Sequence, residues 1–371
     1  MRIAVFGHKR VPSREGGVEI VAEELASRMA ALGHEVTCYN RGGHHVSGAD
    51  FDGAALARYK GIRLKTVPTI DKKGLAAVTS SFFAAAASAF SRADVVHIHA
   101  EGPAFMCWLP KLFGKKVIVT VHGLDWQREK WKQGFGAKYI RWGEKMAVRF
   151  ADGIIVLSRN VQDYFRETYG RETVYIPNGV SCPQLVAAEE ITRQLGLEKD
   201  GYILFLGRLV PEKGVHYLIE AFQKVKTDKK LVIAGGASDS DAYAAGLKAQ
   251  AEGDPRILFT GFVQGRLLEE LYSNAFAYVL PSDVEGMPLS LLEAMSYGNC
   301  CVTSDIPECA EVVEDRAVTF PRGDTAALAA CLQTLCDDPA RVAAYRGSAQ
   351  AFICEKYNWN DVTQKPLELY Q

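Results

Sequence analysis

The 371-residue sequence lacks several common functional signatures, and each absence narrows its class. No G-x-G-x-x-G segment follows its first strand-like run, which argues against a fold that binds NAD. Its nine cysteines include no C-x-x-C pair, so they form neither a zinc pattern nor a disulfide framework. We therefore expect reduced thiols in a cytoplasmic protein.

Long apolar runs are also missing. The uncharged stretch Leu75–Ser91 has 17 residues, which is short of the roughly 20 that a membrane span requires. Its many Ala and Ser residues favour a packed helix. The N-terminus MRIAVFGHKR predicts a first strand rather than a signal peptide. The hydrophobic content of 48% and charged content of 23% are typical of a soluble globular protein.

The net charge of −1 conceals a difference between the two halves of the chain. Residues 1–183 carry 26 Lys and Arg against 17 Asp and Glu, whereas the remainder carries 17 against 27. The net +9 of the first half indicates an anionic surface or partner for that half. No nucleic-acid-binding motif accompanies the charge, so we expect no nucleic-acid partner.

Strand-like and helical segments alternate along the chain, which predicts an α/β fold with parallel sheets. The pattern restarts after Pro183, and the length suits two domains. We predict two doubly wound, Rossmann-like domains that face each other across a cleft, with a boundary near Gly179–Leu185. The predicted strands are Ile3–Phe6, Val36–Tyr39, Val95–His99, Val117–Val121, Ile154–Leu157, Val174–Ile176, Ile203–Leu206, Leu231–Ala234, Ile257–Phe259, Ala277–Leu280 and Cys301–Thr303. The predicted helices of the first half are Val18–Ala31, Leu75–Ser91, Ala137–Phe150 and Val161–Thr168.

Two glutamates, Glu285 and Glu293, bound the segment EGMPLSLLE. Pro288 suits the first turn of a helix, which places Glu285 in the preceding loop. The free N–H groups of such a turn suit a phosphate, and a carboxylate accepts the hydroxyl groups of a sugar. The segment outlines a nucleotide-sugar site, although glutamates at this spacing are usually solvated.

A second charged motif, GRLVPEKG, follows the strand-like run Tyr202–Leu206 and precedes the amphipathic stretch Val215–Phe222. A strand, a tight turn with two cations and a helix present charge at the carboxyl edge of a sheet. Arg208 and Lys213 could both reach one diphosphate. The alternative is a solvated basic turn, and we expect this loop to be exposed.

Together the two motifs resemble those of the retaining glycosyltransferases of family four, which have the GT-B architecture, and in particular those that build bacterial cell-surface polysaccharides. The resemblance covers nearly the whole chain, and its motifs occur in the family's order. The remaining motifs are a Gly16-Gly17 turn, DVVHIH (Asp94–His99), VTVHG ending at His122 and Gly123, ADGIIVLS from Ala151, and IPNGV (Ile176–Val180).

The resemblance implies a hexosyltransferase that uses a nucleotide-diphosphate sugar without a metal or other cofactor. It divides the chain into an acceptor-side domain, residues 1–180 completed by a last helix at 356–371, and a donor-binding domain, residues 181–355. Retention implies a covalent intermediate or front-face attack. The implied roles are neutralisation of the diphosphate by Arg208 and Lys213, a phosphate cradle at Gly16, Gly17, Leu289 and Ser290, nucleobase pairing by the backbone at Val263, ribose binding by Glu293, donor-sugar contact by Glu285, and a place on the reacting face for His122. Ser181 and Met287-Pro288 depart from the commoner residues of the family, which leaves the choice of sugar open.

Other polar residues have simpler explanations. His97 and His99 alternate on one strand and so face the same side, where a metal pair is conceivable. We favour core or cleft-lining roles, because no third ligand has recognisable spacing. The triplet Asp239–Asp241 resembles the metal-binding triplet of another glycosyltransferase architecture, and we interpret it as a solvated turn.

The segment from Trp126 to Arg149 combines seven cations with tryptophan and tyrosine residues. Lys138, Arg141 and Lys145 recur every three or four residues and share a helix face, and Arg128 precedes them. Such a face can lie on anionic lipid, or it is an ordinary solvated stripe over a packed core.

The N-terminal turn PSREGG looks like that of bacterial enzymes that build capsule, exopolysaccharide or O-antigen. The acceptor would then be a glycan linked to polyprenyl diphosphate, at the inner face of the membrane. Two other classes stay open: another GT-B enzyme, such as a sugar-nucleotide epimerase or a phosphorylase, and a non-catalytic nucleotide-sugar-binding subunit.

Overall fold

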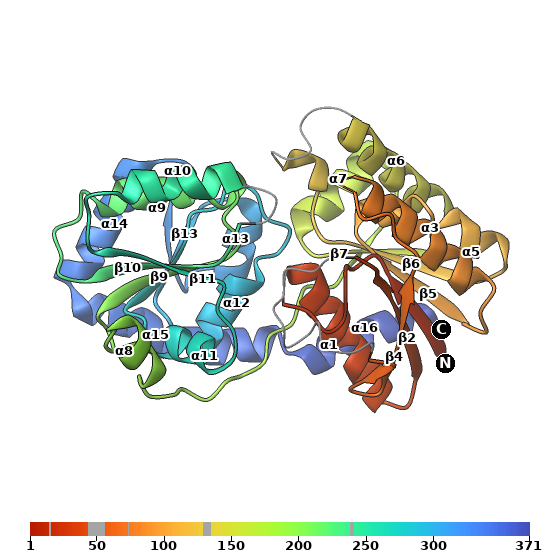
Figure 1. The fold of residues 1–371 in the computed structure, drawn as a ribbon, viewed down its shortest axis with the longest axis horizontal. Helices are drawn as coiled ribbons and strands as arrows, with labels where there is room; N and C mark the ends of the chain where they lie inside the picture. The colour runs from red at the N-terminus through yellow and green to blue at the C-terminus, as the bar shows by residue number, and fades with distance from the viewer. Residues whose placement is uncertain (15, 44–55, 73, 129–134, 238–240) are drawn as a thin grey trace. The chain divides into compact units, whose positions relative to one another are not determined.

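The computed structural model describes residues 1–14, 16–43, 56–72, 74–128, 135–237 and 241–371 (Figure 1). The chain forms two compact units. Unit 1 comprises Met1–Gly179 together with Trp359–Gln371, and unit 2 comprises Val180–Asn358. Each unit is a largely parallel sheet with helices on both faces, which confirms the predicted α/β class.

The sheet of unit 1 has the order β3-β4-β2-β1-β5-β6-β7-β8, and its only antiparallel pair among the described strands is β3 with β4. The chain builds outward from β1 in one direction and then returns to β5 on the other side. The point between β1 and β5 is where open α/β sheets bind ligands. The strands are β1 (Arg2–Phe6), β2 (Glu35–Arg41), β3 (Arg58–Tyr59), β4 (Ile62–Val67), β5 (Val95–His99), β6 (Lys116–Val121), β7 (Gly153–Val156) and β8 (Val174–Tyr175).

Helices cover both faces of this sheet (Figure 1). On one face α1 (Gly17–Ala31) packs against α16 (Trp359–Tyr370), which also contacts β6. The last helix of the chain therefore belongs to the core of unit 1. The other face carries α3 (Leu75–Ala89), α4 (Glu101–Ala104), α5 (Trp108–Leu112), α6 (Phe135–Phe150) and α7 (Arg159–Tyr169).

The sheet of unit 2 is parallel throughout, in the order β11-β10-β9-β12-β13-β14. Its switch point lies between β9 and β12. The strands are β9 (Tyr202–Leu206), β10 (Lys230–Ala234), β11 (Ile257–Gly261), β12 (Ala277–Leu280), β13 (Cys301–Ser304) and β14 (Val318–Phe320). One face carries α9 (Val215–Phe222), α10 (Asp241–Ala251) and α14 (Thr325–Asp337), the other carries α8 (Glu190–Leu195), α11 (Gly265–Asn274), α12 (Leu289–Ser296) and α15 (Pro339–Lys356), and α13 (Pro307–Val313) follows β13.

Every predicted strand and helix occurs, with bounds that differ by at most two residues, except that the last helix begins at Trp359 rather than at residue 356. The apolar periodicity therefore located the elements that form the core. The uncharged stretch from Leu75 forms helix α3, as expected. Among the helices that the structure describes, none is both long and apolar enough to cross a membrane. Strands β3, β4 and β14 were missed, because each is short or alternates charged and apolar residues over only a few positions. Helices α4, α5, α8, α10, α11 and α13–α15 were not predicted either.

One expectation about cysteine is wrong. Cys182 and Cys354 form a disulfide within unit 2, with their Cα atoms 5.6 Å apart, and the other seven cysteines are free. The two residues are 172 positions apart in sequence. They meet because the chain enters unit 2 beside the end of α15, where Val180 donates a backbone hydrogen bond to Tyr357. No spacing rule could have paired them.

Candidate active site

The carboxyl ends of β9 and β12 bring the predicted donor-site residues of unit 2 together. Arg208 follows β9 directly, and Ser282 and Glu285 follow β12. The turn between β9 and α9 packs on the end of β12, because Asp283 donates its backbone N–H to the carbonyl of Glu212 at 2.8 Å. The predicted cations and the first glutamate thus lie at the switch point of the sheet.

Lys213, Glu285 and Ser282 form a hydrogen-bonded cluster at this edge. The Lys213 ammonium and the Ser282 hydroxyl each donate to Glu285 Oε1, at 2.6 Å in both cases. The side chains of Lys213 and Glu285 are only 14% and 8% exposed. A partly buried pair of this kind is geometrically fixed, unlike an exposed pair. The sequence indicates both residues but not their ion pair.

The expectation that the GRLVPEKG loop is exposed is wrong. Gly214 has φ +66°, and a Cβ atom there would lie 2.0 Å from the carbonyl oxygen of Pro281. Only glycine permits this approach, so the loop is packed against the end of β12. Gly235 meets the same restriction, since its Cβ would lie 1.8 Å from the oxygen of Gly207. The two glycines therefore allow the loops at this edge of the sheet to pack closely against the ends of neighbouring strands.

Helix α12 places the second predicted group. Pro288 is the N-cap residue, one position before the predicted place in the first turn, because its ψ of 97° is extended. Leu289 and Ser290 are the first residues of the helix, where amide N–H groups point outward along the axis. One turn further, Glu293 accepts a hydrogen bond from the buried Tyr272 hydroxyl at 3.0 Å.

Tyr272 orients Glu293 and is itself held in place. Its ring stacks on Tyr297, with centroids 5.1 Å apart. Burial raises the pKa of Tyr272 well above its ordinary value, with the Glu293 carboxylate as a further cause. The phenol therefore stays a donor to the carboxylate. Val263, the predicted nucleobase contact, lies half-buried just beyond β11 at the far side of the sheet.

In unit 1, His122 lies at the carboxyl end of β6 and is buried. Its Nε2 atom is 2.9 Å from Nδ1 of His99, at the end of β5. Burial lowers the pKa of His122 to about 3 and that of His99 well below its ordinary value. Both imidazoles are neutral at physiological pH, so one ring nitrogen donates and the other accepts.

His99 belongs to a buried row of aromatic groups. Its ring stacks on that of His97, with centroids 4.4 Å apart. His97 Nε2 lies 2.7 Å from the Thr120 hydroxyl, and its Nδ1 lies 2.5 Å from the hydroxyl of Tyr370 in α16. Burial lowers the pKa of His97 to about 3. The C-terminal helix thus takes part in fixing the strand ends that carry His99 and His122.

Gly16 and Gly17 lie at the start of α1, beside the end of β1. Gly16 is the N-cap and has an extended φ of −166°, so its conformation does not require glycine. A Cβ there would approach the carboxylate of Glu19, at 2.8 Å. Gly17 is the exposed first residue of the helix.

Two family models cover most of the chain. The model described as Glycosyltransferase Family 4 matches residues 15–183, and the model described as Glycosyl transferases group 1 matches residues 187–352. A glycogen synthase from Mycobacterium tuberculosis is 30% identical over 295 residues, which cover 75% of this chain and 69% of the relative. The chain belongs to glycosyltransferase family 4.

Other similar proteins agree with this family. An alpha-maltose-1-phosphate synthase from Mycolicibacterium smegmatis is 26% identical over 399 residues, covering 100% of this chain and 99% of the relative. A sucrose-phosphate synthase from Thermosynechococcus elongatus has a TM-score of 0.83 at 22% identity, covering 100% and 98% of the two chains. Anabaena HepE in complex with UDP-glucose has a TM-score of 0.81 at 20% identity, covering 99% and 98%. The fold of this glycosyltransferase is GT-B.

The basic helix of the transferase is exposed where the sequence predicts. Lys138, Arg141 and Lys145 of α6 all face solvent. The Arg141 guanidinium lies 4.5 Å from the centre of the Trp126 ring, and Arg128 pairs with Asp125 at 3.2 Å. The predicted cations Lys130 and Lys132 lie outside the described residues, as do Asp239 and Ser240 of the acidic triplet. Asp241 is the first residue of α10.

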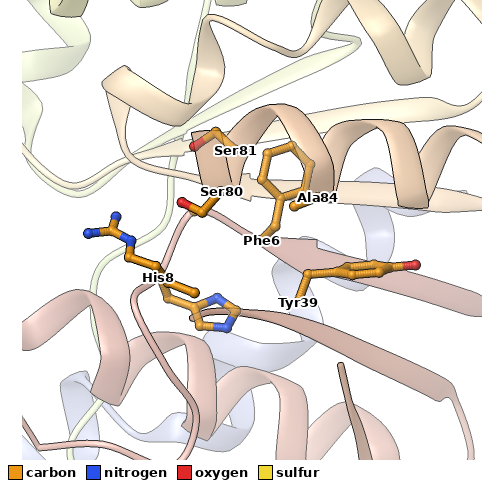
Figure 2. Close-up of a pocket in the computed structure, with 8 residues that line it drawn as sticks. Phe6, His8, Tyr39, Ser80, Ser81 and Ala84 are labelled. Atoms are coloured by element: carbon orange, nitrogen blue, oxygen red, sulfur yellow. The ribbon is translucent and has the colours of Figure 1, made fainter. Parts of the chain in front are cut away.

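A small pocket of about 10 Å³ opens near the carboxyl ends of β1 and β2. Figure 2 shows Ser80 and Ser81 of α3 on one side of it and His8 and Tyr39 on the other. It has room for about one water molecule, too little for a sugar. His8 Nδ1 is buried without a protein partner, and burial lowers the His8 pKa. In the described part of the chain, no cluster of three His, Cys, Asp or Glu residues could hold a metal ion.

Sequence reasoning missed the residues that hold the predicted ones in place. Ser282, Tyr272 and Tyr370 each contact a candidate residue or its neighbour, and none belongs to a motif. Ser282 had a weak signal, because it follows directly on a buried strand. Tyr272 and Tyr370 had none, since helical tyrosines on an apolar face are ordinary core residues.

Proposed function

We propose that this glycosyltransferase moves a hexosyl group from a nucleotide-diphosphate sugar to a glycan acceptor. The Lys213–Glu285–Ser282 cluster carries the proposal. It places a fixed cation and a fixed carboxylate at the switch point of a parallel sheet, one short loop from the N-terminus of α12. A diphosphate needs the cation and the helix amides, and a sugar hydroxyl needs the carboxylate.

Each donor-site residue has a distinct part in this proposal. Arg208 and Lys213 neutralise the diphosphate as it leaves, which stabilises the charge that develops in the transition state. The amides of Leu289 and Ser290, with Gly16 and Gly17, bind phosphate. Glu285 binds hydroxyl groups of the donor sugar, and Glu293 binds the ribose. The backbone at Val263 pairs with the base. Because Anabaena HepE is known in complex with UDP-glucose, we test UDP-glucose first.

His122 lies on the reacting face in this proposal. A neutral imidazole at the end of β6 can exchange a hydrogen bond with a sugar hydroxyl without carrying charge. Its bond to His99 sets which ring nitrogen is available. We propose that transfer retains the anomeric configuration, as the family resemblance implies, and the α-linkage of the product would establish this by NMR.

The acceptor we propose is a glycan linked to polyprenyl diphosphate, in the synthesis of capsule, exopolysaccharide or O-antigen. The exposed cations of α6 and the net +9 of residues 1–183 support it, because both the acceptor and the membrane that holds it are anionic. The enzyme would then work at the inner face of the membrane.

Donor binding is tested by thermal shift and calorimetry with UDP, GDP, ADP and dTDP and their sugars. We expect one nucleotide family to raise the melting temperature, and its sugar to be consumed with an acceptor glycan. Arg208→Ala should weaken that binding about tenfold to a hundredfold, as loss of a charge-assisted contact does. Unchanged diphosphate affinity in this variant would reject the assignment.

We also propose that transfer needs no divalent metal, because lysine and arginine supply the positive charge. Turnover should persist in excess EDTA. Loss of turnover that Mn²⁺ or Mg²⁺ restores would contradict this and would return attention to the Asp239–Asp241 triplet.

Membrane attraction is tested with vesicles that contain anionic lipid. Binding should weaken as salt rises, because the Debye length falls to about 8 Å at 0.15 M. Replacing Lys138, Arg141 and Lys145 by Gln should reduce it, whereas the same change at three exposed lysines of unit 2 should not. Those control residues are Lys199, Lys224 and Lys248. If the native protein binds no vesicles at low salt, the acceptor is soluble.

A further inference from the structure

On helix α3 of unit 1 the small residues face the sheet and large apolar residues face solvent, which is the reverse of an ordinary surface helix. Its buried face consists of small residues: Ser80, Ser81, Ala84, Ala85, Ser88 and Ala89. The serine hydroxyls on that face donate to carbonyls of their own helix, such as Ser80 to Ala76 at 2.6 Å and Ser81 to Ala77 at 2.6 Å. These small side chains let α3 contact β1 and β2 directly. The buried face of α3 therefore packs on the sheet through small side chains and contributes no large apolar group.

The large apolar groups of α3 point outward instead. Leu75, Phe82 and Phe83 are exposed, and Phe90, the C-cap, is 74% exposed. Seven residues are close to two helical turns, so Leu75 lies above Phe82, and Phe83 lies above Phe90. The exposed residues thus form one apolar stripe along the length of the helix. A soluble surface helix normally presents polar side chains there.

The stripe continues onto the neighbouring helix. The rings of Phe90 and Phe113, the C-caps of α3 and α5, meet edge to face with centroids 4.6 Å apart. Leu112 beside them is 69% exposed. Of the five exposed phenylalanines in the described residues, four belong to this patch and the fifth, Phe262, belongs to unit 2. We call Leu75, Phe82, Phe83, Phe90, Leu112 and Phe113 the aromatic patch.

Cations flank the aromatic patch. Helix α5 contacts both α3 and α6, so the three helices form one layer on the same face of the sheet (Figure 1). The outward cations of α6 are Lys138, Arg141, Lys145 and Arg149. No ion pair joins Lys138, Lys145 or Arg149 to a carboxylate within the part of the chain that the structure describes. An apolar patch bordered by exposed cations is complementary to an anionic bilayer.

A second copy of the chain fits this surface less well. Two identical faces brought together would oppose the cations of one α6 to those of the other. An anionic bilayer offers negative head groups to the cations and acyl chains to the phenyl rings, so it satisfies both parts of the surface.

We propose that the aromatic patch of α3 and α5 inserts into the interfacial region of an anionic membrane, with α6 lying on the head groups. This inference rests on the proposed function for the presence of a membrane, and it adds a hydrophobic contact that salt does not screen. It also sets the orientation of unit 1, with the outer surface of the α3–α5–α6 layer against the lipid.

The first experiment separates the hydrophobic part of binding from the electrostatic part. Vesicles of phosphatidylcholine with phosphatidylglycerol are sedimented with the full chain at low salt and at 0.5 M salt. The native protein should keep a salt-resistant fraction of its binding. Phe82→Ser with Phe90→Ser should weaken that fraction about tenfold for each ring removed. Phe262→Ser, a matched exposed ring on unit 2, should leave it unchanged.

A second measurement does not depend on losing binding. Phe90→Trp should show quenching by brominated lipid beyond that of the native tryptophans, whereas Phe262→Trp should show none. Circular dichroism confirms that each variant is folded. Transfer to a soluble acceptor analogue should be the same in the native protein and the Phe82/Phe90 variant, because the patch lies outside the proposed donor site.

The outcomes distinguish this inference from the proposed function. Salt-sensitive binding with no salt-resistant fraction and no quenching at position 90 would overturn the insertion of the patch but leave donor chemistry and the role of α6 intact. Loss of a concentration-dependent dimer in the Phe82/Phe90 variant, measured by light scattering without lipid, would assign the patch to a second copy instead. Absence of nucleotide-sugar binding would reject the proposed function, whatever the vesicles show.

Discussion

The two units both contain a doubly wound sheet, but different chemistry holds their candidate residues in place. Unit 1 contains seven of the eight histidines of the chain, and four of them, His8, His97, His99 and His122, are buried. Unit 2 instead fixes a lysine and two glutamates with hydroxyl groups from Ser282 and Tyr272. The candidate residues at the strand ends of unit 1 are neutral imidazoles, and those of unit 2 are charged.

The net charge of each half of the sequence does not predict the charge of the residues at its strand ends. The first half of the sequence has a net charge of +9, yet its buried strand ends hold neutral imidazoles. Four of its exposed cations lie on the outer helix α6. The second half has a net charge of −10, yet its strand edge carries Arg208 and Lys213. Burial explains this difference, because a buried group stays charged only when it is paired with an opposite charge and hydrogen-bonded.

The largest expected difference between the units is their response to acid. Burial lowers the pKa of His97 and of His122 to about 3. The unfolded chain binds protons below about pH 6.5 and the folded chain does not, so folding stability falls as pH drops through this window. Each fully buried histidine should cost on the order of 3 kcal/mol by pH 4.

Hydrogen exchange at pH 7 and pH 4.5 would report each unit separately. Protection in unit 1 should fall more than protection in unit 2. His97→Gln should flatten the pH dependence of unit 1, whereas His216→Gln, at the single histidine of unit 2, should have a smaller effect. Equal losses in both units would show that the buried imidazoles do not control acid stability.

The disulfide gives unit 2 a covalent link with no counterpart in unit 1, where all described cysteines are free. Cys182→Ser with Cys354→Ser should lower the free energy of unfolding of unit 2 by about 3–5 kcal/mol, since the link closes a long loop. Chemical denaturation with and without reductant measures this. Cys331→Ser is the matched control at a free cysteine. An unchanged midpoint after reduction would mean that the bond does not stabilise unit 2.

Breaking the Lys213–Glu285 pair should have the next largest effect. Lys213→Met leaves Glu285 without its cation, and it should weaken binding of a nucleotide diphosphate by about 1.5–3 kcal/mol. Lys224→Met breaks the exposed Lys224–Glu220 pair, which joins two charges at 2.9 Å, and it should leave the affinity nearly unchanged. Calorimetry measures the nucleotide-diphosphate affinity of both variants. Similar effects from both variants would remove Lys213 from the donor site.

The smallest expected effect concerns a carboxyl pair of unit 1. Glu101 is buried, accepts the Asp125 amide at 2.8 Å, and lies beside Glu144, which accepts the hydroxyls of Tyr164 and Tyr169. Burial, with nearby carboxylates as a further cause, raises the pKa of Glu101 well above its ordinary value. Its folded state keeps a proton that the unfolded chain releases, so it loses stability as pH rises above about 4.3.

Glu101→Gln should remove this dependence while it keeps the bond to Asp125. We expect a melting temperature about 2–4 °C above that of the native protein at pH 8, and a smaller difference at pH 5. Glu167→Gln, on the exposed surface of α7, is the control. A lower melting temperature at pH 8 would show that Glu101 carries a charge in the folded state.

Apolar periodicity located the central strands and helices α1, α3, α6, α7 and α9, because each parallel strand is buried on both faces and each covering helix on one. Strands β3, β4 and β14 escaped detection, since they are short and lie at or next to the edge of a sheet, where a strand need not be apolar. The sequence also placed Arg208, Lys213, Glu285 and His122 in the segments that follow strands, and the structure has them there. It could not place Tyr370 beside His97, because that contact joins residues 273 positions apart.

By itself, the sequence determined the α/β class and the family, since both depend on local periodicity and on the order of short motifs. Only the tertiary structure decided which of those motif residues pair with one another. Lys213 meets Glu285, and Cys182 meets Cys354, because the sheet brings distant strand ends to one edge. It also decided that the phenylalanines of α3 face outward, since small residues already fill the space against the sheet. Only one face of α3 can pack against the sheet, and the packing of the whole fold determines which face it is.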